Sequence, residues 1–277
     1  MLKQRVLTAL VLVGILVPIL ALETPWPFAL VMLAAFSIGA WEWGRLNGAG
    51  ALSPVLGVAL AAVALAAAAL GWGTDAPRTA WWVAFVAWVV GGALTLRGGT
   101  AGWPRAPQAV RLALGLVVLW AAWLALANAK VVGLNFILSV FIVVWAADVF
   151  AYFGGRAFGR RKLAPTISPN KSWEGVWSGV AGVLVVAVLW LLAESSLRVE
   201  SPSLFARLDA RFGWAGMAAV LVFLVAMSIV GDLVESLVKR SAGAKDSSQL
   251  LPGHGGVLDR VDALLPVFPI ALALAFV

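Results

Sequence analysis

The feature that most constrains this chain is its series of long apolar segments. A membrane-spanning helix needs about 20 consecutive, mostly apolar residues. Nine segments meet that requirement, at 5–22, 26–43, 52–72, 79–96, 109–127, 132–152, 173–193, 213–232 and 261–277. This pattern predicts an all-α polytopic membrane protein with about nine transmembrane helices, which form a single integral membrane unit.

The composition supports the same class. Of the 277 residues, 62% are hydrophobic and only 12% are charged, whereas soluble domains are about 25% charged. The chain has no cysteine, which excludes disulfides and thiolate metal sites. The net charge of +7 indicates cytoplasmic loops that face anionic lipid, rather than nucleic-acid binding.

The basic residues predict an orientation, because cytoplasmic loops carry an excess of Lys and Arg. With a cytoplasmic N-terminus, most of the 20 basic residues fall on the cytoplasmic side. The exceptions are Arg78, Lys130, Arg198, Arg207 and Arg211. Nine spans then put the C-terminus outside, in an inner (plasma) membrane, and place the loops 153–172 and 233–260 in the cytoplasm.

The two halves of the chain differ in polarity. Residues 1–130 are interpreted as a lipid-facing scaffold, and 131–277 as the part that forms a catalytic site. In the first half, Trp41-Glu42-Trp43 is interpreted as an interfacial anchor with a solvated acid in preference to a functional role.

A dense polar stretch runs from Asp232 to Asp262 and includes His254, the only histidine. Spacings of three and four place Asp232, Glu235 and Lys239 on one helical face, where they could also form a simple row of ion pairs in water. Asp232 ends one predicted span and Asp259 begins the next on the same side, so the two carboxylates are predicted to converge on a hard divalent cation.

A second polar region runs from Asp148 to Gly175. Asp148 lies near the end of the sixth predicted span, where it is expected to orient a cation of the next loop or assist the metal, unless it is only a solvated acid paired with Arg156. Ser168-Pro-Asn170-Lys171-Ser172 leads directly into the seventh span. A helix N-terminus beside hydroxyls and a lysine suits a phosphate, although Ser172 could also act only as an N-cap beside a solvated Lys171.

Together these regions resemble the phosphatidate cytidylyltransferase family. The signature is carried by Ser236-x-x-Lys239-Arg240, Lys245-Asp246, Ser248 and Leu251-Pro252-x-His254-Gly255-Gly256-x-x-Asp259-Arg260-x-Asp262. The stretches around Asp148 and Ser168 are similar to that family's second region, except that Val149 and Phe150 stand where smaller residues are usual. The resemblance implies that CTP and phosphatidate form CDP-diacylglycerol and pyrophosphate in phospholipid biosynthesis.

The resemblance and the spacing together give each polar residue an expected role. The expected catalytic residues are Asp232, Asp259, Lys239, Arg240, Lys245 and Asp246. The expected substrate-binding residues are Asp148, Ser168, Asn170, Lys171, Ser172, His254 and Arg260. Asp232 and Asp259 are the expected ligands of Mg²⁺, with Asp246 and Glu235 as second choices. The family resemblance also implies K⁺ as a second ion. The expected partners are the two substrates and membrane lipid, with a homodimer left open.

Two other functions fit parts of the sequence. A CTP-dependent polyprenol, dolichol or phytol kinase would need a base to deprotonate an alcohol, and the full signature from Ser236 to Asp262 argues against it. A transporter would explain acids near the membrane. Here, however, the acids lie at one face and no pair of inverted repeats is evident.

Overall fold

The computed structural model describes residues 2–197 and 201–276, and these are almost entirely helical. The long helices are α1 (Leu2–Ala21), α2 (Trp26–Leu46), α3 (Ser53–Ala69), α6 (Gln108–Val132), α7 (Leu134–Phe158), α8 (Trp173–Ser196) and α9 (Leu204–Ser241). The shorter ones are η1 (Gly50–Leu52), α4 (Arg78–Val86), the π-helical η2 (Ala87–Gly91), α5 (Gly92–Gly102), η3 (Trp103–Arg105), α10 (Leu258–Val261) and α11 (Leu264–Ala275). A hairpin of β1 (Lys162–Ala164) and β2 (Ser168–Ser172) joins α7 to α8.

The all-α membrane fold is confirmed. In the described part of the chain, seven helical segments are long and apolar enough to cross a membrane. They lie at 26–46, 50–69, 78–105, 108–132, 134–158, 173–196 and 204–241. The two predicted spans that do not qualify are the first and the last.

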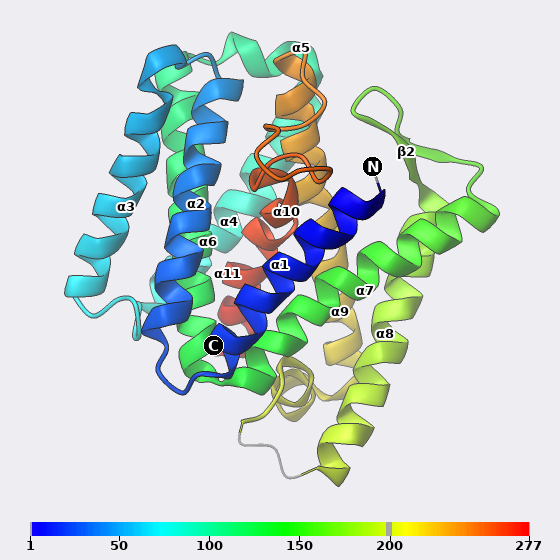
Figure 1. Cartoon of the computed structure of the whole chain (residues 1–277). Coiled ribbons are helices and arrows are strands. Elements are labelled where there is room, and N and C mark those ends of the chain that lie inside the picture. The colour runs from blue at the N-terminus through cyan, green and yellow to red at the C-terminus, as the bar shows by residue number, and fades with distance from the viewer. Residues whose placement is uncertain (1, 198–200, 277) are drawn as a thin grey trace.

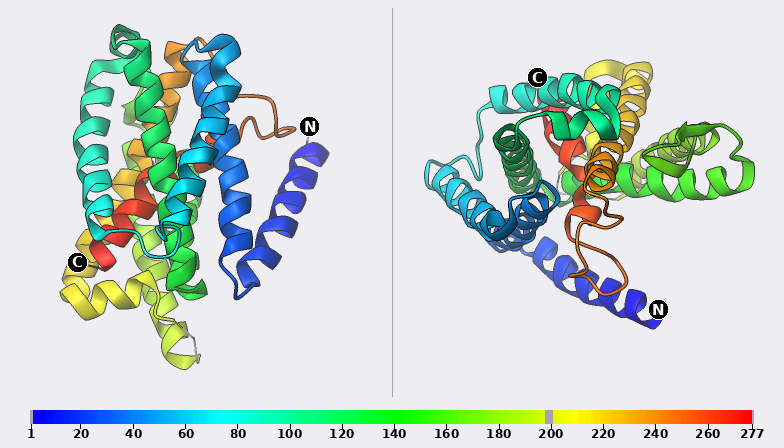
Figure 2. Two further views of the ribbon diagram at one scale, coloured as in Figure 1. Left: turned by 90° about the vertical axis from the view of Figure 1, so that its left-hand side faces the viewer. Right: turned by 90° about the horizontal axis from the view of Figure 1, so that it is seen from above.

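The first predicted span, 5–22, forms α1. Its described apolar segment, Val6–Ala21, is shorter than the seven spans. Figures 1 and 2 show α1 lying obliquely along the outside of the bundle. Its apolar side chains are largely exposed, as at Leu7 and Leu10, so α1 faces lipid rather than other helices. Thr8 nevertheless donates a hydrogen bond from Oγ1 to the carbonyl of Pro252, 3.0 Å away.

The last predicted span, 261–277, is broken into α10 and the 12-residue α11. Prolines at 266 and 269 remove backbone donors, which weakens a continuous helix. The side chains from Leu264 to Ala273 are all buried, and α11 packs against α4, α6, α7 and α9. A helix that is apolar all round and buried belongs to the core.

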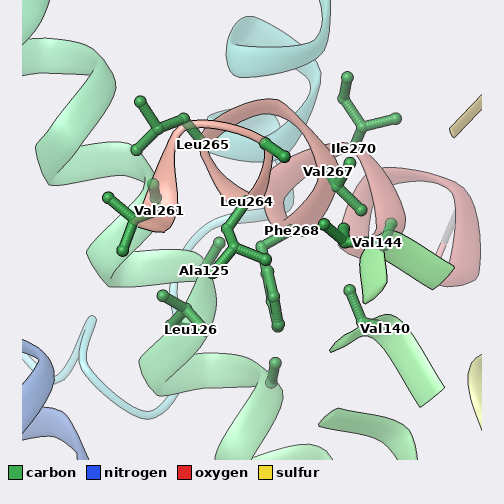
Figure 3. Close-up of a cluster of buried hydrophobic side chains, with 14 of the residues drawn as sticks. Ala125, Leu126, Val140, Val144, Val261, Leu264, Leu265, Val267, Phe268 and Ile270 are labelled. Atoms are coloured by element: carbon green, nitrogen blue, oxygen red, sulfur yellow. The ribbon is translucent and has the colours of Figure 1, made fainter. Parts of the chain in front are cut away.

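Figure 3 shows this core, in which Phe268 of α11 points toward α6 and α7. Its ring meets Phe141 edge-on with the centroids 4.9 Å apart. Ala125 and Leu126 of α6 and Val140 and Val144 of α7 surround it. Within the single membrane unit, α11 thus packs against helices on both sides of residue 130.

The helices nevertheless alternate in direction as nine segments require. In Figure 1 the N-terminus, the β1–β2 hairpin and the loop after α9 lie at one end of the bundle, and α11 descends from that end. The polar loops 159–172 and 242–257 are therefore on the same side, as predicted. This end of the bundle is called the polar end below.

Close packing of α7 and α8 sets the geometry of the polar end. A Cβ on Gly179 would lie 2.9 Å from the carbonyl oxygen of Ala147, and one on Gly175 would lie 2.9 Å from that of Ala151. Small residues let membrane helices approach closely. This approach brings the start of α8 beside Asp148 of α7.

Candidate functional site

One pocket lies between α7, α8 and α9, with a polar upper part and an apolar floor. Its volume is about 270 Å³. The polar lining consists of Asp148, Tyr152, Ser168, Asn170, Lys171, Ser172 and Asp232. The apolar floor consists of Ala147, Ala151, Gly175, Val176, Gly179, Val225 and Ile229. The fold thus gathers Asp148, the Ser168–Ser172 segment and Asp232 around one space, which we call the amphipathic pocket.

An ion pair joins the two predicted regions inside this pocket. The Nζ of Lys171 lies 2.5 Å from Oδ2 of Asp232, and Ser236 donates to the other carboxylate oxygen at 3.2 Å. Asp148 interacts electrostatically with Lys171, Asp232 and Arg260. Arg156 instead contacts the hydroxyl of Tyr152, so the alternative pairing of Asp148 with Arg156 is not seen.

The start of α8 has the cap that its sequence allows. The hydroxyl of Ser172 accepts a hydrogen bond from the amide of Gly175 at 3.2 Å, which satisfies one of the free N–H groups at the helix start. Lys171 is not solvated beside it, because strand β2 directs it to Asp232. A capped helix start and a paired lysine therefore coexist at this site.

A second cluster surrounds Lys239 near the end of α9. Its Nζ lies 2.5 Å from a carboxylate oxygen of Glu235 and 2.5 Å from one of Asp259. Glu235 is only 2% exposed and Lys239 only 9%. The alternative of ion pairs on a helix that emerges into water does not hold for these two residues, because they pair with each other but are buried.

The loop before α10 fixes the other oxygen of Asp259. Its Oδ2 accepts hydrogen bonds from the amide of Ser247 at 2.9 Å and from the amide of Gly256 at 2.7 Å. Burial alone would raise the pKa of Asp259, but Lys239 and the Gly256 amide outweigh it and hold that pKa below its usual value. Asp259 is therefore kept as a carboxylate in a fixed orientation.

Asp232 and Asp259 each pair with a different lysine. Asp262 interacts electrostatically with Asp232, and burial, with the charge of Asp232 added, raises the pKa of Asp262 to about 8. Within residues 2–197 and 201–276, no cluster of three or more His, Asp or Glu side chains is arranged to hold a metal by itself. The structure thus shows a row of acids (Asp232, Glu235, Asp259 and Asp262) rather than a closed metal cage.

The donors present still suit Mg²⁺, which often takes only one or two carboxylates together with substrate phosphates. All the acids in the row offer oxygen ligands. Apart from its ion pair with Lys239, the Glu235 carboxylate has no hydrogen-bond donor in the described part of the chain. Such a buried acid is chemically ready to accept a cation.

The remaining predicted residues lie around these two clusters. Lys245 and Asp246 line a second, polar pocket of about 640 Å³ with Arg45, Leu46, Ala242, Ala244, Ser247, Ser248 and Gln249. Arg240 donates to the backbone carbonyls of Ala244 and Ile167, at 3.2 and 3.5 Å, and so ties two loops together. His254 is half-buried and its amide donates to the carbonyl of Leu251, while Arg260 is exposed.

Glu42 contacts the loop that borders the candidate site, which the favoured sequence interpretation did not predict. It is completely buried, and its carboxylate accepts hydrogen bonds from residues 247–258. The prediction of an interfacial anchor with a solvated acid is wrong, and the neighbouring Trp43 is buried as well. The available signal was an acid inside an otherwise apolar segment, which is by default a functional candidate.

Fold and site together define the class of protein. It is a multi-pass integral membrane protein whose lysines, carboxylates and hydroxyls gather at one end of the bundle, beside a pocket that continues between apolar helices. Such a site suits an anionic head group that is attached to an apolar tail.

Comparison with known proteins places the chain in a family. The model of the cytidylyltransferase family matches residues 3–277, so the chain belongs to that family. It is 44% identical to a phosphatidate cytidylyltransferase of Pseudomonas aeruginosa, over 99% of this chain and 97% of that protein. It is 36% identical to one of Haemophilus influenzae, over 97% of this chain and 96% of the relative. A Bacillus subtilis protein of the same name is 39% identical over 50% of this chain and 46% of its own length.

Proposed function

We propose that this chain transfers the cytidylyl group of CTP to phosphatidate and releases pyrophosphate. The observation that carries the proposal is the amphipathic pocket, where Lys171 and Asp232 lie above an apolar floor. The relatives that match over nearly the full chain bear the name of this activity.

The proposed reaction requires neutralisation of the phosphate charges more than it requires a general base. A phosphate oxygen of the lipid attacks the α-phosphorus of CTP, and a new phosphorus–oxygen bond forms. The bond from the α-phosphorus to the bridging oxygen breaks, and its electron pair leaves with pyrophosphate. The attacking oxygen is already anionic, so cations and alignment supply most of the catalysis. Lys171 and Lys239 provide positive charge within this site.

Mg²⁺ would neutralise phosphate charge at the acids of the polar end. We propose Asp232 and Asp259 as its ligands, with Glu235 and Asp246 as second choices and K⁺ as a second ion. Asp232 is open to the amphipathic pocket, and Asp259 presents a fixed carboxylate from α10.

The amphipathic pocket suits the lipid substrate. On α9 its lining runs from Val225 of the floor to the polar Asp232, which is about 10 Å along a helix at 1.5 Å per residue. An acyl chain can lie against Val176, Gly179 and Ile229 while the lipid phosphate meets Lys171. A cytidine ring would gain little from such a floor.

The polar pocket beside α2 suits the nucleotide. Arg45 and Lys245 place two exposed cations on it, and cations are the expected partners of a triphosphate. Ser247 lines this pocket and also donates its amide to Asp259. The pocket therefore borders the acid row on the side away from the lipid.

We further propose that the polar end faces the cytoplasm of a bacterial inner membrane. Arg45, Arg105 and the hairpin cations lie near this end, whereas Arg78, Lys130 and Arg207 lie near the other. Arg198, also predicted on the outer side, lies outside the described residues. This distribution follows the excess of basic residues in cytoplasmic loops. A homodimer stays a prediction.

The decisive experiment supplies the purified protein with CTP labelled at the α-phosphate, phosphatidate and Mg²⁺. We expect a lipid-soluble labelled product and released pyrophosphate, both abolished by EDTA. Release of CDP, with label absent from lipid, would instead show the CTP-dependent kinase. Solute uptake by vesicles without CTP turnover would favour the transporter.

A further inference from the structure

Glu42 connects the first half of the chain to the candidate site. It lies on α2, and all four of its hydrogen-bond donors lie more than 200 residues later. Its Oε1 accepts from the hydroxyl of Ser248 at 2.5 Å and from the amide of Val257 at 3.0 Å. Its Oε2 accepts from the amide of Leu258 at 2.7 Å and lies 3.1 Å from the hydroxyl of Ser247. One carboxylate therefore holds both ends of the loop 247–258.

This loop is the same one that orients Asp259. The hydroxyl of Ser247 lies between the two acids, 3.1 Å from Glu42 and 2.9 Å from Asp259. Its single hydrogen can serve only one of them at a time, so the amides of Ser247 and Gly256 complete the hold on Asp259. The position of the Asp259 carboxylate is therefore set by a loop that Glu42 holds in place.

The Glu42 carboxylate is closely packed against the loop at Gly256. Gly256 is buried, and a Cβ there would clash with both the Glu42 carboxylate and the Ser247 hydroxyl. A carboxylate without a paired cation is costly to bury unless donors satisfy it. Four donors do so here, and all of them come from residues 247–258 rather than from α2 itself.

We propose that Glu42 is a positioning residue for the cation and phosphate site. It does not touch a substrate but fixes the loop 247–258, and through that loop the orientation of Asp259. This inference rests on the proposed use of Mg²⁺ by Asp259. It assigns a role in the site to the half of the chain that was predicted to be only a scaffold.

The test compares Glu42→Gln with Glu23→Gln in the purified full-length chain. A carboxamide has the same shape but only one acceptor oxygen, so two of the four donors lose their partner. Glu23 is an exposed acid in the turn between α1 and α2, so the control receives the same substitution without a buried partner. Two quantities are measured, namely the Mg²⁺ concentration that gives half-maximal CDP-diacylglycerol formation and the rise in Tm that Mg²⁺ alone produces.

We expect Glu42→Gln to need about 10–100-fold more Mg²⁺ for half-maximal rate, the usual cost of losing a supporting contact behind a metal ligand. The rise in Tm should move to higher Mg²⁺ concentration in parallel, and Glu23→Gln should match the wild type in both. If Glu42→Gln lowers Tm and rate but leaves both Mg²⁺ requirements unchanged, Glu42 only stabilises the fold and the proposal is overturned.

Two further measurements keep the result decisive. If Glu42→Gln does not fold, Ser248→Ala removes a single donor and should shift both Mg²⁺ requirements in the same direction. An unchanged requirement in that variant overturns the proposal. The rise in Tm needs neither CTP nor lipid. A wild type that is stabilised by Mg²⁺ but forms no CDP-diacylglycerol would therefore refute the proposed function and still test Glu42.

Discussion

Lys239 and Asp259 form an ion pair, with Nζ 2.5 Å from Oδ1, that joins the end of the longest helix to the loop-fixed start of α10. The same ammonium group lies 2.5 Å from Glu235. One buried lysine thus pairs with two acids at the point where the substrates are proposed to react.

Replacement of Lys239 by Met should abolish activity and lower stability. Two buried acids would lose their shared cation, and breaking a buried ion pair costs about 3–5 kcal/mol. Thermal unfolding in detergent and the rate of CDP-diacylglycerol formation measure the two effects. Lys162→Met changes an exposed lysine of the hairpin and should alter neither; comparable losses in both variants would contradict the role of Lys239.

A bulky side chain in the floor of the amphipathic pocket should weaken lipid binding. Val176→Phe fills part of the floor, so KM for phosphatidate should rise about tenfold, equivalent to about 1.4 kcal/mol, while KM for CTP stays unchanged. The same substitution at Val185, an exposed position on the same helix, is the matched control. An equal effect at both positions would contradict lipid binding in this pocket.

The proposed binding of the two substrates in different pockets predicts that two lysines affect the KM of different substrates. Lys171→Ala should mainly raise KM for phosphatidate, because Lys171 lies above the apolar floor. Lys245→Ala should mainly raise KM for CTP, because Lys245 lines the polar pocket. Steady-state kinetics with each substrate varied in turn measure both values. Reversal of the two effects would show that each pocket binds the other substrate.

Gly231 should be intolerant of a side chain. A Cβ at this position would lie 2.5 Å from the carbonyl oxygen of Asp262 and 2.9 Å from the ring of Pro266. Gly231→Ala should therefore reduce the free energy of unfolding by about 1–3 kcal/mol, as overpacking of a core does. Gly14→Ala on α1 meets no atom within 4 Å and should not destabilise the protein. Equal Tm values for the two variants would contradict this packing.

The absence of cysteine from the sequence allows a clean test of orientation. Thr166→Cys puts a unique thiol in the exposed hairpin at the polar end, and Asp75→Cys puts one in the exposed turn at the opposite end. A membrane-impermeant maleimide should label position 75 in intact spheroplasts and position 166 only after lysis. The reverse labelling pattern would show that the protein has the opposite orientation in the membrane.

The sequence predicted the placement of polar residues well where that placement depends on local structure. Spacings of three and four correctly placed Asp232, Glu235 and Lys239 on one helix, since helical periodicity is a local property. The sequence also correctly placed 168–172 directly before a helix, which begins at Trp173 with Ser172 as its N-cap. The convergence of both regions on one pocket agrees with the predicted position of their loops on one side of the membrane.

The errors arose where a residue's surroundings come from distant parts of the chain. The segment 261–277 looks like a span because length and hydropathy do not distinguish lipid from protein as the neighbour. Glu42 looks like a solvated acid because its four donors lie more than 200 residues away.

By itself, then, the sequence determined the class, the all-α membrane fold, the polar regions and the family, because composition, periodicity and motif spacing are written along the chain. Only the tertiary structure decided which acid pairs with which lysine, that the last apolar segment fills the core, and that Glu42 supports the site. The physical reason is that burial and hydrogen bonding depend on which helices pack together, and packing joins residues that the sequence keeps far apart.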